Sequence, residues 1–349
     1  MTLPDRRRVL AGLAAAVAPI PGIAQETVTR EAAIRDSAGR PVPVPAAVAR
    51  VFPAGPPAAI LLYTLAPDLL LGWPRANRPE ERAYLLPDVG SRPEVGRLTG
   101  RGNTANLEVV LQLKPDLILD VGSTAATYVS LADRVQGQTG IPYALLDGRL
   151  DAAAQTYRTL GQLVRREREG AELAAYTAAI LKTVGERVAS VHAERRPRTY
   201  YARGPRGLET GLAGSINVES IEIMGARNVA GERRGGLATV SLEQVLAWDP
   251  EVIVAIDLDF VATVRSDPAW ASVTAVRNGR VHLAPKLPFG WVDFPPSVNR
   301  LLGLWWLGKV LYGDLFPEDL ATIARDFHAR FYHLPITAGQ ASQILAGRG

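Results

Sequence analysis

The chain has 349 residues with a formal net charge of +4, and 47% of its residues are hydrophobic while 21% are charged. This length can bury at least one large core, and the composition is typical of a globular rather than a disordered protein. The absence of cysteine excludes a disulfide scaffold, a thiolate metal site, a cysteine nucleophile and a lipid-modified cysteine anchor. Basic and acidic residues are interspersed without a long basic tract, which argues against nucleic-acid binding.

Residues 1–24 have the pattern of an export signal. Three arginines at positions 6–8 precede an apolar stretch over 9–18 that is too short to span a bilayer, and prolines follow it. The arginine pair also fits a twin-arginine signal, so the ordinary and the twin-arginine export routes both stay open. We expect cleavage after Ala24 and an exported protein without a lipid anchor.

Short apolar runs alternate with helical stretches between residues 48 and 147. Such alternation is typical of β-α-β units, so we expect a parallel sheet in this part of the chain. The expected strands are 48–52, 68–73, 117–121 and 143–146, and the expected helices are 58–66 and 107–113.

Residues 151–195 contain helix formers and no strand pattern. Apolar residues recur every three or four positions from Leu173 to Val191, which predicts a helix with one apolar face. We expect Gly170 to separate two helices. A helix over 171–194 would be about 36 Å long, which suits a connection between two lobes. A long core helix of a single domain stays open as the alternative.

The alternation resumes after residue 198 and ends in a helical region. The expected strands are 198–203, 252–256 and 281–284, the expected helices are 216–224 and 299–331, and the core positions of the last region are Leu301, Leu304, Trp305, Leu307 and Leu311. Together these elements predict an α/β fold with two Rossmann-like lobes, each with a parallel sheet, joined by one long α-helix. The expected domains are an N-terminal lobe over 25–150, linking helices over 151–197 and a C-terminal lobe with C-terminal helices over 198–349.

An internal repeat relates the two halves of the chain. Residues 106–120 align without gaps to residues 241–255, and Glu108 with Glu243 is among the identical pairs. Each copy predicts a helix with a polar N-cap, a proline that ends the helix, and a buried parallel strand. Because packing does not require the shared glutamate, the repeat favours duplication of one lobe.

Three tracts, at 106–119, 240–254 and 267–285, resemble in this order the periplasmic substrate-binding proteins of iron-siderophore and vitamin B12 ABC importers. The resemblance spans roughly residues 48–315. It implies the helical-backbone class of these receptors, with two lobes joined by one long helix and a ligand held between them. It also implies a periplasmic location and delivery to an ABC permease. The tract 290–301 resembles a subgroup associated with the uptake of iron, cobalamin or oxyanions.

The ligand of such a fold is expected beyond the carboxyl ends of the parallel strands. Arginine offers a planar donor fork to anionic groups, and tryptophan and tyrosine offer broad faces. This mixture favours a bulky, partly apolar and anionic ligand. The expected ligand-binding residues are Trp73, Tyr84, Arg203, Arg206, Lys286 and Trp291.

The cargo that the resemblance implies is a chelated metal, such as a ferric siderophore, a corrinoid or a haem-like compound. A molybdate-like oxyanion is the alternative. The four histidines are scattered along the chain, so we expect no direct metal site and no cofactor. A chelatase-like enzyme of similar fold is an alternative of another class. We expect no catalytic residues, because the sequence contains no known nucleophile, metalloprotease or dinucleotide-binding motif.

Glu108 and Glu243 occupy matched sites near the start of the two repeat helices. Stabilisation of the helix dipole would explain an acid at each site. The resemblance implies a second role, because the corresponding acids of the family project from each lobe and pair with arginines of the two membrane subunits. We therefore expect a monomeric receptor that docks on a permease dimer through these two glutamates.

Overall fold

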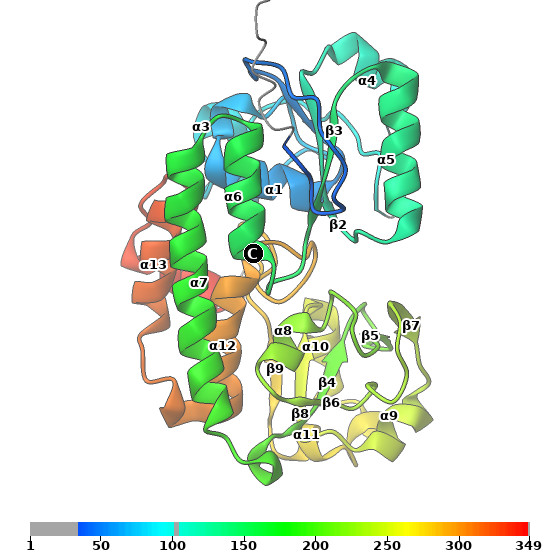
Figure 1. Ribbon diagram of the computed structural model, residues 1–349. Helices are drawn as coiled ribbons and strands as arrows, with labels where there is room; N and C mark the ends of the chain where they lie inside the picture. The colour runs from blue at the N-terminus through cyan, green and yellow to red at the C-terminus, as the bar shows by residue number, and fades with distance from the viewer. Residues whose placement is uncertain (1–33, 101–104, 348–349) are drawn as a thin grey trace, which may run out of the picture. The chain divides into compact units, whose positions relative to one another are not determined.

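Two separate parallel sheets organise the chain in the computed structural model, which describes residues 34–100 and 105–347 (Figure 1). The first sheet consists, in spatial order, of β1 (Val51–Pro53), β2 (Leu117–Gly122) and β3 (Tyr143–Asp147). The second consists of β6 (Arg227–Asn228), β4 (Arg198–Ala202), β8 (Val252–Ala255) and β9 (Val281–Leu283). All neighbouring strands in these sheets are parallel, so the predicted α/β class is confirmed.

Helices account for most of the remaining regular structure. They are α1 (Pro56–Leu65), α2 (Pro79–Arg82), α3 (Pro87–Gly90), α4 (Leu107–Leu113), α5 (Ala126–Thr139), α6 (Ala153–Leu163), α7 (Glu167–Ala189), α8 (Glu219–Ile223), α9 (Leu242–Trp248), α10 (Leu258–Val264), α11 (Thr274–Arg277), α12 (Arg300–Tyr312), α13 (Leu320–Phe331) and α14 (Ala338–Leu345). An antiparallel pair, β5 (Glu209–Gly211) and β7 (Leu237–Thr239), is an addition that the sequence did not lead us to expect.

The two repeat helices α4 and α9 have the same local construction. The side chain of Asn106 accepts a hydrogen bond from the N–H of Val109 at the start of α4, and Ser241 does the same for Gln244 in α9. The helices end at Lys114 and Asp249, which are both left-handed and directly precede a proline. The residue before proline avoids the right-handed helical region, so neither helix continues. The predicted unit of capped helix, proline and buried strand is therefore confirmed in both copies.

The predicted helix break at Gly170 is wrong. The break lies between Leu163 and Glu167, and Gly170 is inside α7. A Cβ on Gly170 would lie 2.7 Å from the carbonyl oxygen of Tyr157 in α6. The glycine therefore allows α6 and α7 to approach each other closely, and it does not end a helix.

Two further boundaries differ from expectation. The expected strand 68–73 is not formed: its first two residues belong to a 3-10 turn over Pro67–Leu69, because proline fixes a backbone angle suited to the start of a helical turn. Of the remaining residues, Leu70 and Trp73 form only isolated bridges. The expected helical region 299–331 consists of α12 and α13, and Asp319 caps the second helix by accepting hydrogen bonds from its first turn. Trp305, expected in the core, is only half-buried.

One large hydrophobic core joins one side of the first sheet to long helices of the chain, and it also includes residues of the second sheet such as Tyr201 and Val254. The other side of the first sheet packs against α4 and α5 in a separate cluster. The large core includes buried residues of α1, α6, α7, α12, α13 and α14. The hydroxyl of Tyr63 in α1 donates to the carbonyl oxygen of Tyr332 over 3.0 Å, and the rings of Tyr157 and Phe331 meet edge to face. The end of α13 therefore packs against α1 and α6. The second sheet has a smaller core of its own around Tyr200, Ile253 and Phe260.

The expected export signal over 1–24 lies outside the described residues. Within 34–100 and 105–347, no helix has both the length and the apolar composition needed to span a membrane.

Candidate functional site

The carboxyl ends of β2 and β3 enclose a small cavity together with the segment that leads into α12. Ligands of parallel α/β sheets collect at such strand ends. The cavity has a volume of about 30 Å³, which is room for about two water molecules. Residues of α1, β2 and α6 form its apolar wall, and its polar lining includes Asp147, Arg149, Thr156, Ser297 and Arg300.

Gly148 brings the two strand ends together at this cavity. Its N–H donates to the carbonyl oxygen of Gly122 over 2.9 Å, and a Cβ on Gly148 would lie 2.9 Å from the Cα of Gly122. Any other residue at 148 would push β2 and β3 apart. The carbonyl oxygen of Gly148 is then free to face the guanidinium of Arg300, which donates to it.

Arg300 is a buried cation in the cavity wall, with 2% of its side chain exposed. Its Nη1 donates to the Glu219 carboxylate over 2.6 Å, and its Nε donates to the carbonyl oxygen of Ser297 over 3.1 Å. Burial lowers the pKa of Arg300, and the negative charge of Glu219 opposes this effect. An arginine guanidinium keeps its charge when it is buried. Here the ion pair with Glu219 and the hydrogen bonds to carbonyl oxygens replace the water that Arg300 loses on burial.

Glu219, the first residue of α8, brings a carboxylate to the same place. Both of its carboxylate oxygens accept from the N–H of Leu150, over 3.0 and 3.1 Å. The Nη2 of Arg149 lies 4.0 Å from the nearer oxygen. The carboxylate of Glu219 is therefore surrounded by two guanidinium groups and one backbone N–H that come from the end of β3 and the start of α12.

A second buried network is centred on Asp293, with 1% of the residue exposed. The hydroxyl of Tyr201 and the Nη1 of Arg203 each donate to one carboxylate oxygen over 2.6 Å, and the Nδ2 of Asn217 donates to the other over 2.8 Å. Burial and the Asp293 charge raise the pKa of Tyr201, so its hydroxyl remains a donor. Asp293 thus fixes the end of β4 against the segment before α12.

The three aromatic residues expected to contact ligand are buried. The indole N–H of Trp73 donates to the carbonyl oxygen of Val89, and that of Trp291 donates to the carbonyl oxygen of Leu287. Tyr84 packs beside His328, with 5.9 Å between ring centroids. All three side chains belong to the core described above, which gives each a packing role. A ligand contact for them stays a prediction.

The three expected cationic ligand residues lie in different surroundings. Arg203 is buried and paired with Asp293, and its Nε lies 3.2 Å from the carboxylate of Glu209. Arg206 is exposed and Lys286 is half-buried. None of the six expected ligand residues lines the strand-end cavity, so the structure does not bring them together in one pocket. Their ligand-binding role also stays a prediction.

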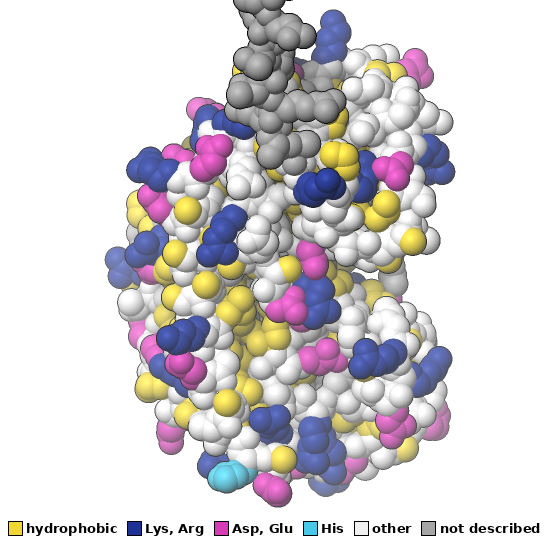
Figure 2. Space-filling model, viewed as in Figure 1, with side chains coloured by type: hydrophobic (Ala, Val, Ile, Leu, Met, Phe, Trp, Pro, Cys, Tyr) yellow, Lys and Arg dark blue, Asp and Glu magenta, His cyan; other side chains and the backbone are white. Residues whose placement is uncertain are grey.

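Glu108 and Glu243 are both exposed in the first turns of α4 and α9. Hydrogen bonds from its own backbone N–H and from Ser241 lower the pKa of Glu243. Two apolar residues beside Glu108, namely Val109 and Leu111, are exposed as well. Charged side chains of both signs alternate over the face of the molecule that Figure 2 shows.

Sequence reasoning did not single out Glu219, Asp293 and Arg300. One signal was available for Arg300, because it opens an otherwise strongly apolar helix over 300–312. An arginine in such a position, if buried, needs a carboxylate partner. The sequence does not indicate which of the many acids is that partner, since Glu219 lies 81 positions away.

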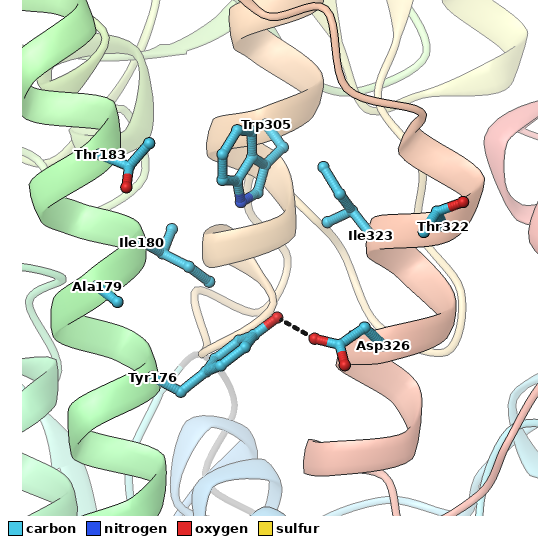
Figure 3. A pocket seen from close by; sticks show the side chains of 8 residues that line it. All are labelled: Tyr176, Ala179, Ile180, Thr183, Trp305, Thr322, Ile323 and Asp326. Atoms are coloured by element: carbon cyan, nitrogen blue, oxygen red, sulfur yellow. Dashed lines mark hydrogen bonds between the residues drawn. The ribbon is translucent and has the colours of Figure 1, made fainter.

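A larger groove, of about 480 Å³, lies elsewhere, between α7, α12 and α13 (Figure 3). Trp305 and Ile180 form its apolar part, and the hydroxyl of Tyr176 donates to the carboxylate of Asp326 over 2.7 Å at one end. The guanidinium of Arg330 covers the Tyr176 ring at 4.9 Å. No strand end of either sheet contributes to this groove, so it is separate from the strand-end cavity.

In the part of the chain that the structure describes, no group of three histidine, cysteine, aspartate or glutamate residues is arranged to hold a metal ion. The histidines at 282, 328 and 333 all have lowered pKa values because they are wholly or partly buried.

Comparisons with known proteins agree with this architecture. A family model described as periplasmic binding protein matches residues 59–287. The molybdate-binding protein MolA of Haemophilus influenzae is 30% identical over 263 residues, which are 69% of this chain and 74% of that protein. A solved ABC transporter solute binding protein from Sulfurospirillum deleyianum is 26% identical with a TM-score of 0.82, covering 90% of this chain and 99% of that one. The solved structure of H. influenzae MolA bound to molybdate is 25% identical with a TM-score of 0.72, covering 88% and 99%.

Proposed function

The chain belongs to the periplasmic binding protein family of ABC importers, and we propose that it is a receptor for a small oxyanion of the molybdate class. The observation that carries the proposal is the 30% identity to a molybdate-binding protein over 69% of the chain. Members of this family are binding proteins of transporters and not enzymes, so the chelatase-like alternative loses its basis.

The strand-end cavity supports an oxyanion ligand by its lining and its size. Arg149 and Arg300 place guanidinium groups at it, and Ser297 adds a hydroxyl. The hydroxyl of Thr156, in contrast, donates to the carbonyl oxygen of Asp147. Guanidinium groups form short, strong hydrogen bonds to charged oxygens. A volume of about 30 Å³ is on the scale of a few atoms, whereas drug-sized ligands need pockets of roughly 300–1,000 Å³. The cavity therefore suits an inorganic anion better than a siderophore or a corrinoid.

A chelated metal, the cargo expected from the sequence, is the second candidate. The feature that favours it is Phe294, whose side chain is 69% exposed and lies beside Arg203, with 5.7 Å between guanidinium carbon and ring centroid. An exposed aromatic face next to a cation suits a partly apolar anionic chelate. The burial of Trp73, Tyr84 and Trp291 argues for placing this candidate below the oxyanion.

Calorimetric titration of the purified protein distinguishes the two candidates. Molybdate and tungstate are titrated beside sulfate, phosphate, a ferric siderophore, haem and cobalamin. We expect saturable one-to-one binding of molybdate and tungstate and a concentration-dependent rise in melting temperature, because a ligand that binds only the native state stabilises it. Binding of a chelate without binding of any oxyanion would establish the second candidate and overturn the first.

A pair of arginine variants tests the location. Arg149→Ala removes a cavity donor and should weaken molybdate binding about tenfold, the loss expected for one charge-assisted hydrogen bond. Arg158→Ala is the matched control, because Arg158 is an exposed arginine of α6 that does not line the cavity. Equal affinities of the two variants would show that the oxyanion binds elsewhere.

Delivery to the permease is proposed to involve Glu108 and Glu243. Both acids are exposed, and they occupy matched positions in α4 and α9. Carboxylates at the rim of an interface steer encounter and orientation. As a member of its family the protein acts in the periplasm, where it serves an ABC importer.

A further inference from the structure

The carboxylate of Glu219 occupies a set of donors that is suited to a free anion. It accepts from the Nη1 of Arg300 over 2.6 Å and from the N–H of Leu150 over 3.0 and 3.1 Å, and the Nη2 of Arg149 is 4.0 Å away. Two guanidinium groups and a backbone N–H converging on one pair of oxygens are the usual components of an oxyanion site.

These donors also border the strand-end cavity. Arg149, Leu150 and Arg300 all line it, while Glu219 itself does not. An anion in the cavity would therefore compete with the Glu219 carboxylate for the same N–H groups. Since Arg300 is buried and held by the carbonyl oxygens of Gly148 and Ser297, its charge stays in place when its anionic partner changes.

We propose that Glu219 is a built-in competitor for the oxyanion: its carboxylate holds the Arg300 and Leu150 donors in the empty receptor and yields them to the ligand. The inference rests on the proposed function for the identity of that ligand. Arg300 keeps an anionic partner throughout this exchange, because the oxyanion takes the place of the Glu219 carboxylate. Arg149, whose side chain is half exposed, already pairs with Asp151 and lies 4.0 Å from Glu219, so it is the cation nearest to the displaced carboxylate after Arg300.

If Glu219 competes with the ligand, removing its charge should strengthen molybdate binding. A purely structural ion pair between Glu219 and Arg300 would not have this effect. Glu219→Gln keeps the size of the side chain and an acceptor oxygen for Leu150, but it removes the competing charge. We expect this variant to bind molybdate about tenfold more tightly than the wild type, because the ligand no longer has to displace a carboxylate. Glu222→Ala, in the same helix but outside the cavity, should bind molybdate as the wild type does.

A second experiment tests whether added anions restore the stability of Glu219→Ala, in which the side chain is cut back to a methyl group. This change leaves Arg300 without a carboxylate and should lower the melting temperature. Added molybdate, sulfate or acetate should then restore much of the loss, and sodium chloride at equal ionic strength should not. The same anions should raise the melting temperature of Glu222→Ala no more than that of the wild type.

The outcomes separate the inference from the proposed function. Unchanged or weaker molybdate binding by Glu219→Gln, in a wild type that binds molybdate, would overturn the competitor role alone. Rescue of Glu219→Ala by acetate or sulfate, in a wild type that binds no oxyanion, would support the anion site and overturn the molybdate proposal. Absence of rescue by every anion tested would also overturn the competitor role, and Glu219→Gln provides an independent measurement if Glu219→Ala does not fold.

Discussion

Asp293 neutralises a buried cation, and its hydrogen bonds define how β4 meets the segment before α12. It accepts from Tyr201, Arg203 and Asn217, and it is almost fully buried. Asp293→Asn should lower the free energy of unfolding by about 3 kcal/mol, because a buried cation loses its closest counter-charge. Chemical denaturation with a two-state analysis measures the loss.

The control for this change is an ion pair at the surface. Asp151 pairs with Arg149 at 2.7 Å, and both side chains are more than half exposed. Asp151→Asn should therefore cost less than about 1 kcal/mol. A cost for Asp293→Asn as small as this would contradict the structural role assigned to the buried network.

His328 couples the stability of the core to pH. Burial lowers its pKa to about 4, and it stacks on Tyr332 and packs beside Tyr84. In the unfolded chain its pKa returns to about 6.5, so the unfolded state binds the extra proton first as the pH falls. This histidine therefore contributes stability above about pH 6.5 that is lost between about 6.5 and 4, up to about 3 kcal/mol.

His328→Phe should remove this part of the pH dependence, since phenylalanine fits the same stack of rings. Thermal melts at pH 7.5 and 4.5 should differ less for the variant than for the wild type. His192 is exposed, so His192→Gln should leave the difference unchanged. An equal pH dependence of His328→Phe and the wild type would show that this side chain does not carry the effect.

The partners and surroundings of single site residues were the hardest features to predict from the sequence. Arg203 was identified correctly as a residue at the end of β4, because it follows an apolar run. Its partner Asp293 is 90 positions away, and no local pattern specifies such a pairing. Trp73 and Trp291 illustrate the opposite difficulty, because composition does not distinguish an indole that packs in the core from one that faces a ligand.

At the scale of elements, the contact between α6 and α7 depends on paired glycines. A Cβ on Gly170 would lie 2.7 Å from the carbonyl oxygen of Tyr157 and 3.1 Å from the Cα of Gly161. Gly170→Ala should therefore destabilise the fold by about 2 kcal/mol, despite the better helix propensity of alanine, because the helices must move apart. Equilibrium denaturation of the variant measures this cost.

Gly185 is the matched control within the same helix. It is exposed, and a Cβ there would meet no atom within 4 Å. Gly185→Ala should therefore stabilise the protein by up to about 1 kcal/mol through helix propensity alone. Stabilisation by both substitutions would show that α6 and α7 do not need the close approach at Gly170.

The elements with strong local signals were predicted well. The strand at 117–121 and the helix at 107–113 were found almost to the residue, because an apolar run, a polar cap and a proline mark their limits. The pair β5 and β7 was missed, since each strand has only three residues and the two are far apart in sequence. Breaks between helices were harder to predict, because a glycine can either end a helix or, like Gly170, allow two helices to pack closely.

At the scale of the whole molecule, the alternation of strands and helices was sufficient to predict two parallel sheets. It did not predict that α12, α13 and α14, assigned by chain order to the C-terminal lobe, bury their apolar faces in one large core that includes residues of both sheets. Periodicity identifies an apolar face but not its partner. The hydrogen bond between Tyr63 and Tyr332 spans 269 positions of the chain and illustrates how non-local this packing is.

The repeat places an exposed glutamate at a matched position in each half of the chain, and the proposed docking on the permease depends on this pair. Glu108 and Glu243 follow equivalent N-caps in α4 and α9. A permease built from two similar subunits would meet one acid with each subunit. Rim charges govern encounter rate and orientation more than the stability of the receptor itself.

Replacing both Glu108 and Glu243 by alanine should therefore reduce transport without harming the receptor. We expect unchanged ligand affinity and melting temperature, because both side chains are exposed, and uptake through the cognate permease reduced at least about tenfold. Uptake of labelled ligand into reconstituted proteoliposomes measures the effect. The matched control is Glu172→Ala with Glu186→Ala, which removes two exposed acids of α7. Normal transport by the Glu108 and Glu243 double variant would overturn the docking role, and so would a loss of ligand binding, because the two acids would then belong to the ligand site.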